Sequence, residues 1–346
     1  MAAPTPMAFV IAGKIDDKEF HQARVVARHL ASENAHVTVE VQEFTESDWE
    51  EYIRRKAKEL GGDAYAHRLS PLVYYNRVNY IGLGSDFLAF VARVFNYVTR
   101  PNNVLYTRMA HRAYRDFLDG SANPFAYFDV SVGGGKAERV VFELFADKCP
   151  RTVENFLSLC AGTKGRGHSY VGTPFHRVVP GGWVQGGDTA GGHGDGGEAA
   201  AGGTIADESF EIKHDRPGIL AMANDGGPHS NGSQFYITLA ELPWLDYKRV
   251  AFGRVISGMR VVRRLEKETC ENQRPVAPCV IQAAGEYTSA TYKTSPASAA
   301  GGSGGAAEEK KESPAGDRAA LYTETFNEVD TEGRGRVAGR APAEGG

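Results

Sequence analysis

One stretch of the chain places an arginine and a glutamine, Arg177 and Gln185, on two short runs of alternating apolar residues. A Pro-Gly-Gly bend at residues 180–182 separates the runs, so the pattern predicts two strands joined by a tight turn. Side chains alternate between the two faces of a strand, and the even offset therefore predicts that Arg177 and Gln185 share a face. A fixed cation with amide partners can stabilise a distorted peptide group without a nucleophile or a metal.

Further motifs follow this pair along the chain. They are Met222-Ala223-Asn224, Asn231-Gly232-Ser233-Gln234-Phe235 and Trp244-Leu245-Asp246. Together with Phe175-His176-Arg177 and Gln185-Gly186-Gly187-Asp188, they closely resemble the cyclophilin family of peptidyl-prolyl cis-trans isomerases in order and spacing. The chain is similar to the peptidyl-prolyl isomerase-like 6 group of that family, which is associated with ciliated cells and axonemes. The resemblance covers roughly residues 7 to 287.

The resemblance implies isomerisation of the peptide bond that precedes proline. The barrier to this rotation is about 18–20 kcal/mol and arises from amide resonance, so an enzyme lowers it by favouring the twisted amide. By resemblance, Arg177 is the catalytic arginine, Gln185 orients its guanidinium, and Asn224 grips the substrate backbone. No cofactor and no metal are expected. The substrate-binding positions that the resemblance implies are Gly182, Trp183, Ala223, Gln234, Tyr236, Trp244, Leu245 and Arg249.

The proline pocket departs from the family pattern. The family usually has phenylalanine where this chain has Gly182, methionine where it has Trp183, and histidine where it has Arg249. The second phenylalanine of the cleft is replaced by Tyr236. Because Trp244 is kept, the resemblance also implies binding of cyclosporin-type ligands. The catalytic cation is therefore retained while its pocket is remodelled.

Two functions remain open from the sequence. The first is an active isomerase that acts on X-Pro bonds of protein clients. The second is a weakly active or inactive peptide-binding or structural protein, by resemblance one of the ciliary or flagellar axoneme. Retention of Arg177, Gln185 and Asn224 favours the first function, whereas Gly182 and Arg249 favour the second.

Several other features have a simpler interpretation. His176 is expected to be structural, because isomerisation needs no acid or base. Residues 192–197 satisfy Gly-x-Gly-x-x-Gly, but no strand and helix flank them as a dinucleotide site requires. Residues 330–337 resemble the first half of an EF-hand loop, yet Arg334 and Ala341, at the fifth and twelfth loop positions, stand where calcium needs oxygen donors. The four cysteines fit no zinc spacing and are expected to be reduced thiols.

Composition limits the other function classes. The chain has 346 residues, 42% of them hydrophobic, and a net charge of -4, which is typical of a soluble protein with two or three domains. The chain has no excess of basic residues of the kind that nucleic-acid binding needs. No apolar run approaches the ~20 residues of a membrane span. Residues 1–7 lack the features of a secretory signal. A cytoplasmic protein is therefore expected, with proline-containing clients and, by resemblance, axonemal proteins as partners.

Residues 7–100 predict the order βαβαββα from their hydrophobic periodicity. This order, with Pro71 before the third strand, resembles the thioredoxin and glutaredoxin fold. Chemistry in that fold needs a thiolate at the start of the first helix, and no cysteine precedes Cys149. The expectation is a redox-inactive thioredoxin-like module that serves for docking.

The rest of the chain predicts four further segments. Residues 101–123 predict a connecting helix, and residues 124–287 the cyclophilin-like domain. Many short strands with two amphipathic helices imply a closed antiparallel β-barrel capped by the helices. Residues 288–318 are rich in Ser, Ala, Gly, Thr and Pro and predict a flexible linker. Residues 319–346 predict a C-terminal helix with the degenerate EF-hand-like loop.

Overall fold

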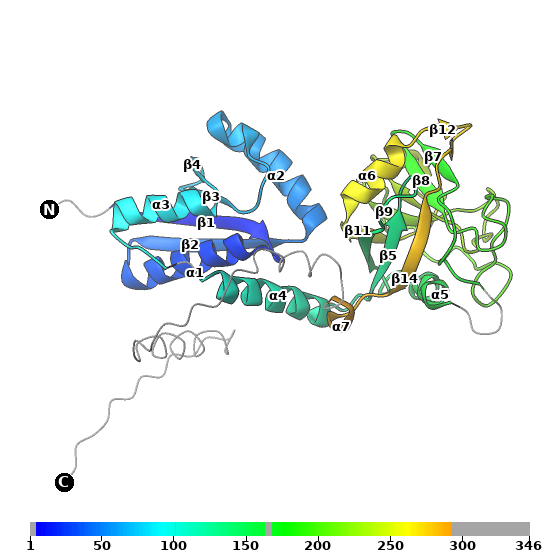
Figure 1. Cartoon of the computed structure of the whole chain (residues 1–346), viewed down its shortest axis with the longest axis horizontal. Coiled ribbons are helices and arrows are strands. Elements are labelled where there is room, and N and C mark those ends of the chain that lie inside the picture. Colours follow the sequence, from blue (N-terminus) through cyan, green and yellow to red (C-terminus); the bar gives the residue numbers. More distant parts are fainter. Residues whose placement is uncertain (1–4, 101, 163–167, 293–346) are drawn as a thin grey trace, which may run out of the picture. The chain divides into compact units, whose positions relative to one another are not determined.

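A computed structural model describes residues 5–100, 102–162 and 168–292 (Figure 1). The described residues belong to one compact unit. Of the predicted linker at 288–318, only the first residues are described. The predicted C-terminal helix and EF-hand-like loop, residues 319–346, lie outside the described residues.

The N-terminal region contains a mixed four-stranded sheet. Its strands are β1 (Met7–Lys14), β2 (Val37–Phe44), β3 (Leu72–Tyr75) and β4 (Asn79–Gly82), in the order β2-β1-β3-β4. Strand β1 runs parallel to β2 and antiparallel to β3. The order of strands and helices predicted for this region is confirmed.

Helices cover both faces of this sheet (Figure 1). Helices α1 (Lys18–Glu33) and α3 (Gly84–Phe95) pack on one face, and α2 (Glu46–Leu60) packs on the other. Consecutive residues of β1 divide between the two layers, so that Ile11 lies in the core with α1 and Ala12 in the core with α2.

Short elements link α2 to β3 within the N-terminal region, and one helix connects that region to the second sheet. A 3-10 helix, η1 (Gly62–Ala66), follows α2, and the Ser70–Pro71 peptide bond before β3 is cis. Helix α4 (Asn103–Gly120) occupies the place of the predicted connecting helix. It takes part in an apolar cluster that joins the N-terminal region, α4 and the second sheet and consists of Ile15, Tyr114, Leu118, Phe125, Val141, Ile256 and Tyr287.

The second sheet is a curled antiparallel sheet of eight strands, in the order β14-β5-β6-β11-β9-β10-β8-β7. A separate two-stranded ladder follows α6. The strands of the large sheet are β5 (Phe125–Ser131), β6 (Glu138–Leu144), β7 (Arg177–Val179), β8 (Trp183–Gly186), β9 (Ile219–Met222), β10 (Phe235–Thr238), β11 (Ala251–Ser257) and β14 (Val280–Glu286). The strands of the small ladder are β12 (Cys270–Glu271) and β13 (Arg274–Pro275).

The edges of the curled sheet approach each other without a continuous ladder between them. Strands β14 and β7 are its two edges. An isolated bridge joins Pro174 to Val280, and the Phe175 N–H donates to the Cys279 carbonyl at 2.8 Å. The structure therefore shows a curled antiparallel sheet, and its closure into a barrel stays a prediction.

Two helices complete the core of the curled sheet, as their apolar stripes predict. Phe156 of α5 (Pro150–Ala161) and Leu265 of α6 (Met259–Lys267) are fully buried in it. The ring of Phe156 lies 5.1 Å from that of Tyr170 and 5.8 Å from that of Phe235, measured between centroids. Two shorter elements are η2 (Pro243–Leu245) and α7 (Ser289–Tyr292).

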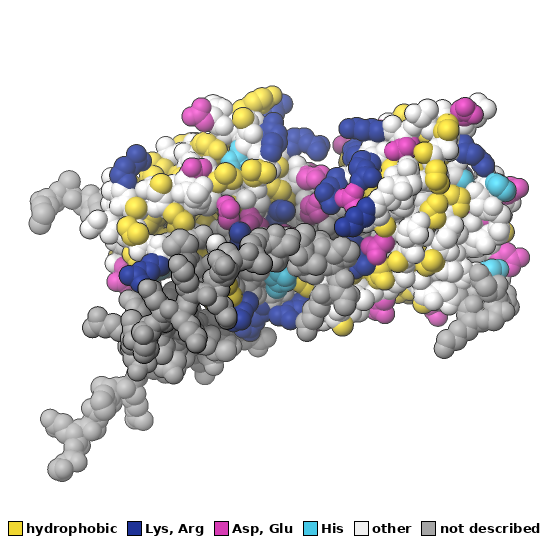
Figure 2. Space-filling model, in the orientation of Figure 1, with side chains coloured by type: hydrophobic (Ala, Val, Ile, Leu, Met, Phe, Trp, Pro, Cys, Tyr) yellow, Lys and Arg dark blue, Asp and Glu magenta, His cyan; other side chains and the backbone are white. Residues whose placement is uncertain are grey.

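The surface carries charges of both signs. Figure 2 shows Lys and Arg side chains intermingled with Asp and Glu on the face that it presents. On α6, for example, Arg264 pairs with Glu138, and Arg263 pairs with Glu266 at 3.1 Å. Within the ranges that the structure describes, no helix is both long and apolar enough to cross a bilayer, and no three His, Cys, Asp or Glu side chains gather as metal ligands would.

Truncating Phe156 tests the core of the curled sheet. We expect Phe156→Ala to lower the free energy of unfolding by about 3–5 kcal/mol, because it removes a fully buried ring and the surrounding structure fills the resulting cavity only in part. Urea unfolding followed by circular dichroism measures the loss. The control, Val171→Ala, changes a side chain that is 46% exposed and should stay within about 0.5 kcal/mol of wild type. Equal losses in both variants would contradict this account of the core.

Candidate functional site

The register of four strand pairs places Arg177 and Gln185 in one cross-strand row. Arg177 of β7 stands directly opposite Gln185 of β8, which stands opposite Tyr236 of β10. The row continues through Ala221 of β9 to Ala251 of β11. Residues directly opposite each other project from the same face of a sheet. The prediction that Arg177 and Gln185 share a face is therefore confirmed.

Neighbouring residues on the same strands project to the other face. Val178, Val184, Phe235 and Met222 are buried in the main core, together with the helices α5 and α6. The alternation thus gives the curled sheet an inner face that holds the core and an outer face that carries the row of Arg177.

An apolar cluster lies beside this row on the outer face. Tyr236 is 3% exposed, and the ring of Trp183 lies 5.9 Å from it between centroids. We call this cluster, with Arg177 and Gln185, the outer-face site. Its apolar members are Trp183, Ile212, Ile219, Ala221, Ala223, Tyr236, Leu245 and Ala251.

Gly182 does not leave an open space beside Trp183. The glycine is buried in the turn between β7 and β8, where its N–H donates to the Val179 carbonyl at 2.9 Å. A β-carbon at position 182 would stand 3.1 Å from Cγ1 of Val179, closer than ordinary van der Waals contact. The apolar surface here therefore comes from Trp183, and a phenylalanine at position 182 fits only if Val179 moves.

The guanidinium of Arg177 has two neighbours. Its Nε donates to Oε1 of Gln273 at 2.8 Å, and its carbon lies 5.5 Å from the centroid of the Trp183 ring. Gln273 belongs to the turn between β12 and β13. A cation over an indole face is held by the ring quadrupole. Arg177 is thus an exposed residue at the rim of the outer-face site, where its guanidinium contacts a residue from a distant turn.

The hydrogen-bond partners of Gln185 do not include Arg177, the partner that the sequence predicts. Its Nε2 donates to Oε1 of Gln234 at 2.9 Å, and its Oε1 accepts from the indole N–H of Trp183 at 3.3 Å. Gln234 in turn donates to the carbonyl of Gly196 at 2.8 Å. Gln185 and Gln234 lie together, as expected, but the hydrogen bond described for Arg177 goes to Gln273. The orienting role of Gln185 stays a prediction.

Asn224 lies at the end of β9 with its side chain engaged in its own loop. Its Nδ2 donates to Oδ1 of Asn231 at 3.1 Å, and its Oδ1 accepts from the N–H of Gly226 at 3.1 Å. Next to it, Ala223 donates its N–H to the carbonyl of Gln234 at 2.9 Å. The amide of Asn224 therefore shapes the loop at the end of the site, and its grip on a substrate backbone stays a prediction.

The remaining predicted residues come from the loop after β10. Leu245 packs against the apolar cluster, whereas Trp244 is 58% exposed. Arg249 is half-buried, and its Nη1 donates to the carbonyl of Lys248 at 3.1 Å. Burial raises the pKa of the Tyr236 hydroxyl. The positive charge of Arg249 opposes that shift.

Sequence reasoning missed a buried polar chain behind Tyr236. His214 is fully buried, and its Nε2 lies 2.7 Å from the Tyr236 hydroxyl. Its Nδ1 and its backbone N–H both lie 2.9 Å from Oδ1 of Asp246. A carboxylate only accepts, so Nδ1 carries the proton and Nε2 accepts from the tyrosine. Asp246 belongs to a recognised motif, but no sequence signal connects it to His214.

His176 is buried beneath the site and packs against Gly194, whose added β-carbon would overlap the imidazole. Burial lowers the pKa of His176. Burial also raises the pKa of the Cys149 thiol to about 12, and none of the four cysteines forms a disulfide. The arrangement can bind an apolar ring and a peptide backbone and can present one cation to them.

Comparison with known proteins gives a consistent result. A family model described as "Cyclophilin type peptidyl-prolyl cis-trans isomerase/CLD" matches residues 127–286. A Bos taurus protein named "Probable inactive peptidyl-prolyl cis-trans isomerase-like 6" is 36% identical over 291 residues, which cover 81% of this chain and 93% of the relative. Proteins of the same name from Mus musculus and Homo sapiens are 36% and 35% identical over 290 and 292 residues, covering 81% of this chain and 91% and 92% of the relatives.

The buried histidine predicts a pH dependence of stability. Burial lowers the pKa of His214, although Asp246 opposes the shift. The unfolded histidine titrates near its ordinary pKa of about 6.5, so below that pH the unfolded chain binds more protons than the folded one. We therefore expect the free energy of unfolding to fall as pH decreases from 7.5 to 5.5, and His214→Gln to flatten this decrease. Urea titrations across that range that give the same slope for both proteins would contradict the assignment.

Proposed function

The chain belongs to the cyclophilin family of peptidyl-prolyl cis-trans isomerases, and we propose that its outer-face site binds X-Pro segments of proteins and isomerises them only weakly. The apolar cluster would receive the pyrrolidine ring, and Arg177 and the amides beside it would hold the adjoining peptide groups. Binding would then be the main activity and turnover a minor one.

The position of Arg177 carries this proposal. Catalysis of amide rotation needs a cation that is preorganised toward the twisted amide, because only interactions stronger in the transition state than in the ground state accelerate the reaction. Here the guanidinium donates to Gln273 at 2.8 Å and lies over Trp183. The hydrogen bond to Gln273 occupies one of the five N–H donors of the guanidinium, the one on Nε, and the contact with Trp183 favours a position over the indole. The apolar cluster beside Arg177 is formed by other residues, so the surface that would bind the proline ring does not depend on that cation.

An active isomerase is the second candidate. Arg177 stands opposite Gln185, and Gln234 lies within hydrogen-bond distance of Gln185, which supports an electrostatic site of the family type. The names of the relatives, which call those proteins probably inactive, support the binding function instead.

Four further points belong to the same proposal. The bridge between Pro174 and Val280 supports closure of the curled sheet into a barrel. The sheet order β2-β1-β3-β4 with helices on both faces supports a thioredoxin-like N-terminal region, which has no cysteine for redox chemistry. The exposed Trp244 is available to a cyclosporin-type ligand. The proposed partners are proline-containing clients in the cytoplasm, with axonemal proteins among them by resemblance to the group.

Replacing Arg177 separates binding from turnover. In a protease-coupled isomerase assay we expect weak activity from the full-length protein and a further loss of about 10²–10³ in kcat/KM for Arg177→Ala, as when one preorganised donor is removed. The affinity for a proline peptide, measured by NMR titration, should change much less. Arg177→Lys keeps the charge but not the planar fork and should recover little. If the wild type binds no proline peptide, the proposed function is wrong.

Releasing Arg177 from Gln273 should raise turnover. Position 273 has a φ of +67°, so Gln273→Gly keeps the turn and removes only the side chain that holds the guanidinium. A hydrogen bond of this kind contributes about 0.5–1.5 kcal/mol, and we therefore expect kcat/KM to rise about two- to tenfold. The matched control is Asn272→Gly, at φ +49° in the same turn. Equal activity in both variants would show that Gln273 does not restrain Arg177.

A further inference from the structure

The outer face of the curled sheet also carries a second cross-strand row, next to that of Arg177. Trp183 of β8 stands opposite Thr238 of β10, and Ile219 of β9 donates its N–H to Oγ1 of Thr238 at 2.9 Å. Ile219 stands opposite Arg254 of β11, which stands opposite Glu143 of β6. Arg254 is thus one strand away from Ile219, a member of the outer-face site.

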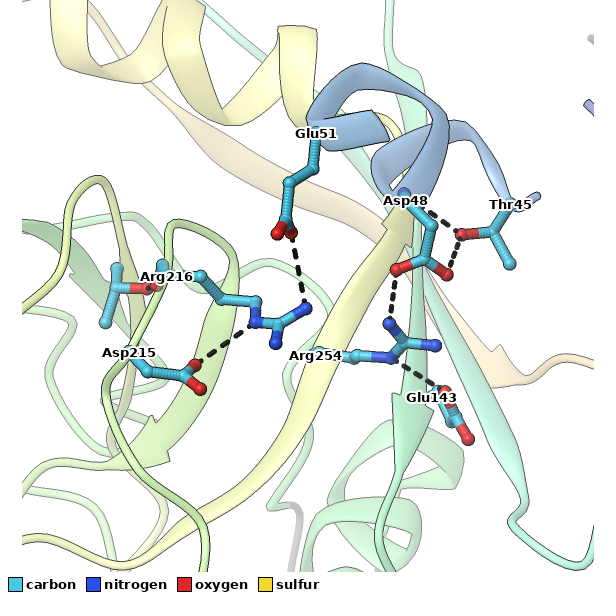
Figure 3. Close-up of polar contacts among 8 residues, drawn as sticks. Thr45, Asp48, Glu51, Glu143, Asp215, Arg216 and Arg254 are labelled. Carbon is cyan, nitrogen blue, oxygen red and sulfur yellow. Dashed lines mark hydrogen bonds and ion pairs between the residues drawn. The ribbon is translucent and has the colours of Figure 1, made fainter. Parts of the chain in front are cut away.

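Helix α2 of the N-terminal region contacts this row through Arg254. Figure 3 shows Asp48 of α2 and Glu143 of β6 on either side of the Arg254 guanidinium. Nη1 of Arg254 donates to Asp48 at 2.6 Å and Nε donates to Glu143 at 2.9 Å. The three side chains are 15–29% exposed, so solvent screens them less than a surface pair. Thr45, the N-cap of α2, donates to the second oxygen of Asp48 at 2.8 Å and fixes its orientation.

A second contact runs from α2 to the loop before β9. Glu51 points toward Arg216, whose Nη1 lies 3.3 Å from its carboxylate (Figure 3). The carbonyl of Arg216 accepts from Oγ1 of Thr238 at 2.8 Å. Two residues earlier in the same loop, His214 holds the hydroxyl of Tyr236. One short loop therefore contacts α2 on one side and supports the outer-face site on the other.

We propose that α2 positions the outer-face site, with Arg254 and Arg216 as the positioning residues that transmit its docking to Ile219, Thr238 and Tyr236. The inference rests on the proposed function, since it makes the N-terminal region a determinant of peptide affinity. The physical reason is that α2 contacts Arg254, whose cross-strand row lies next to the row of Arg177 on the same face of the sheet. A displacement of α2 takes Asp48 away from Arg254 and Glu51 away from Arg216. Among the described ion pairs, Arg254 then keeps only Glu143 and Arg216 only Asp215, and the backbone that carries the site loses two restraints.

The test uses full-length protein with both α2 carboxylates neutralised, Asp48→Asn with Glu51→Gln. We expect the affinity for a proline peptide, measured by NMR titration, to fall about three- to tenfold, as for other coupled pairs in contact. The indole N–H signal of Trp183 and the amide signals of residues 214–216 should shift in the absence of peptide. The matched control is Glu59→Gln, which removes a carboxylate of α2 that pairs with Lys56 of the same helix. It should change neither readout.

A charge exchange distinguishes positioning from general stability. Arg216→Glu alone should weaken peptide binding, and Arg216→Glu with Glu51→Arg should restore it, because the pair is rebuilt with its signs reversed. A purely structural role would lower the unfolding midpoint without moving the Trp183 signal, and that outcome would overturn the inference. If the wild type binds no proline peptide, the proposed function fails, and the Trp183 and loop signals still decide the inference. Unchanged signals in the double variant would overturn it.

Discussion

The pairing of β10 with β8 and β9 is the constraint on which the outer-face site depends. Phe235 and Tyr236 are neighbours in β10 and project to opposite faces of the sheet. Phe235 packs in the main core, where its ring contacts Phe156 and Tyr170, while Tyr236 lies in the apolar cluster of the site. A slip of one residue would exchange the two faces. The packing of the aromatic core therefore fixes which side chains the site presents.

In the outer-face site, the groups suited to binding an apolar ring differ from the group suited to catalysis. Trp183 supplies apolar surface beside a position closed by Val179, and it also lies beneath the guanidinium of Arg177. Gln273 holds that guanidinium from another turn of the chain. A proline ring gains from the apolar cluster whether or not its amide bond rotates, whereas catalysis of the rotation needs the cation preorganised toward the twisted amide and not toward Gln273. In the proposed function, this arrangement therefore favours retention of a peptide over its turnover.

The polar contacts of α2 make the N-terminal region part of the environment of the site. The hydroxyl of Thr45, the N-cap of α2, donates to one carboxylate oxygen of Asp48, and Arg254 donates to the other. The carboxylate is therefore oriented by its own helix for the contact with Arg254. On the other side, Arg254 is held by Glu143 in the adjacent strand. A charge held between two carboxylates in a partly buried position is sensitive to the loss of either one. The N-terminal region thus contributes to the sheet face as well as carrying its own core.

The sequence alone determined the faces and the elements of this protein. Alternation predicted that Arg177 and Gln185 share a face, apolar stripes predicted α5 and α6, and the motifs predicted the family, because each of these is encoded by residues close together in the chain. It did not determine the partners of the side chains. Arg177 meets Gln273, 96 positions away, and Tyr236 meets the buried His214. Only the curl of the sheet and the paths of its loops bring such residues within hydrogen-bond distance. Local periodicity in the sequence predicts neither the curl nor the loop paths.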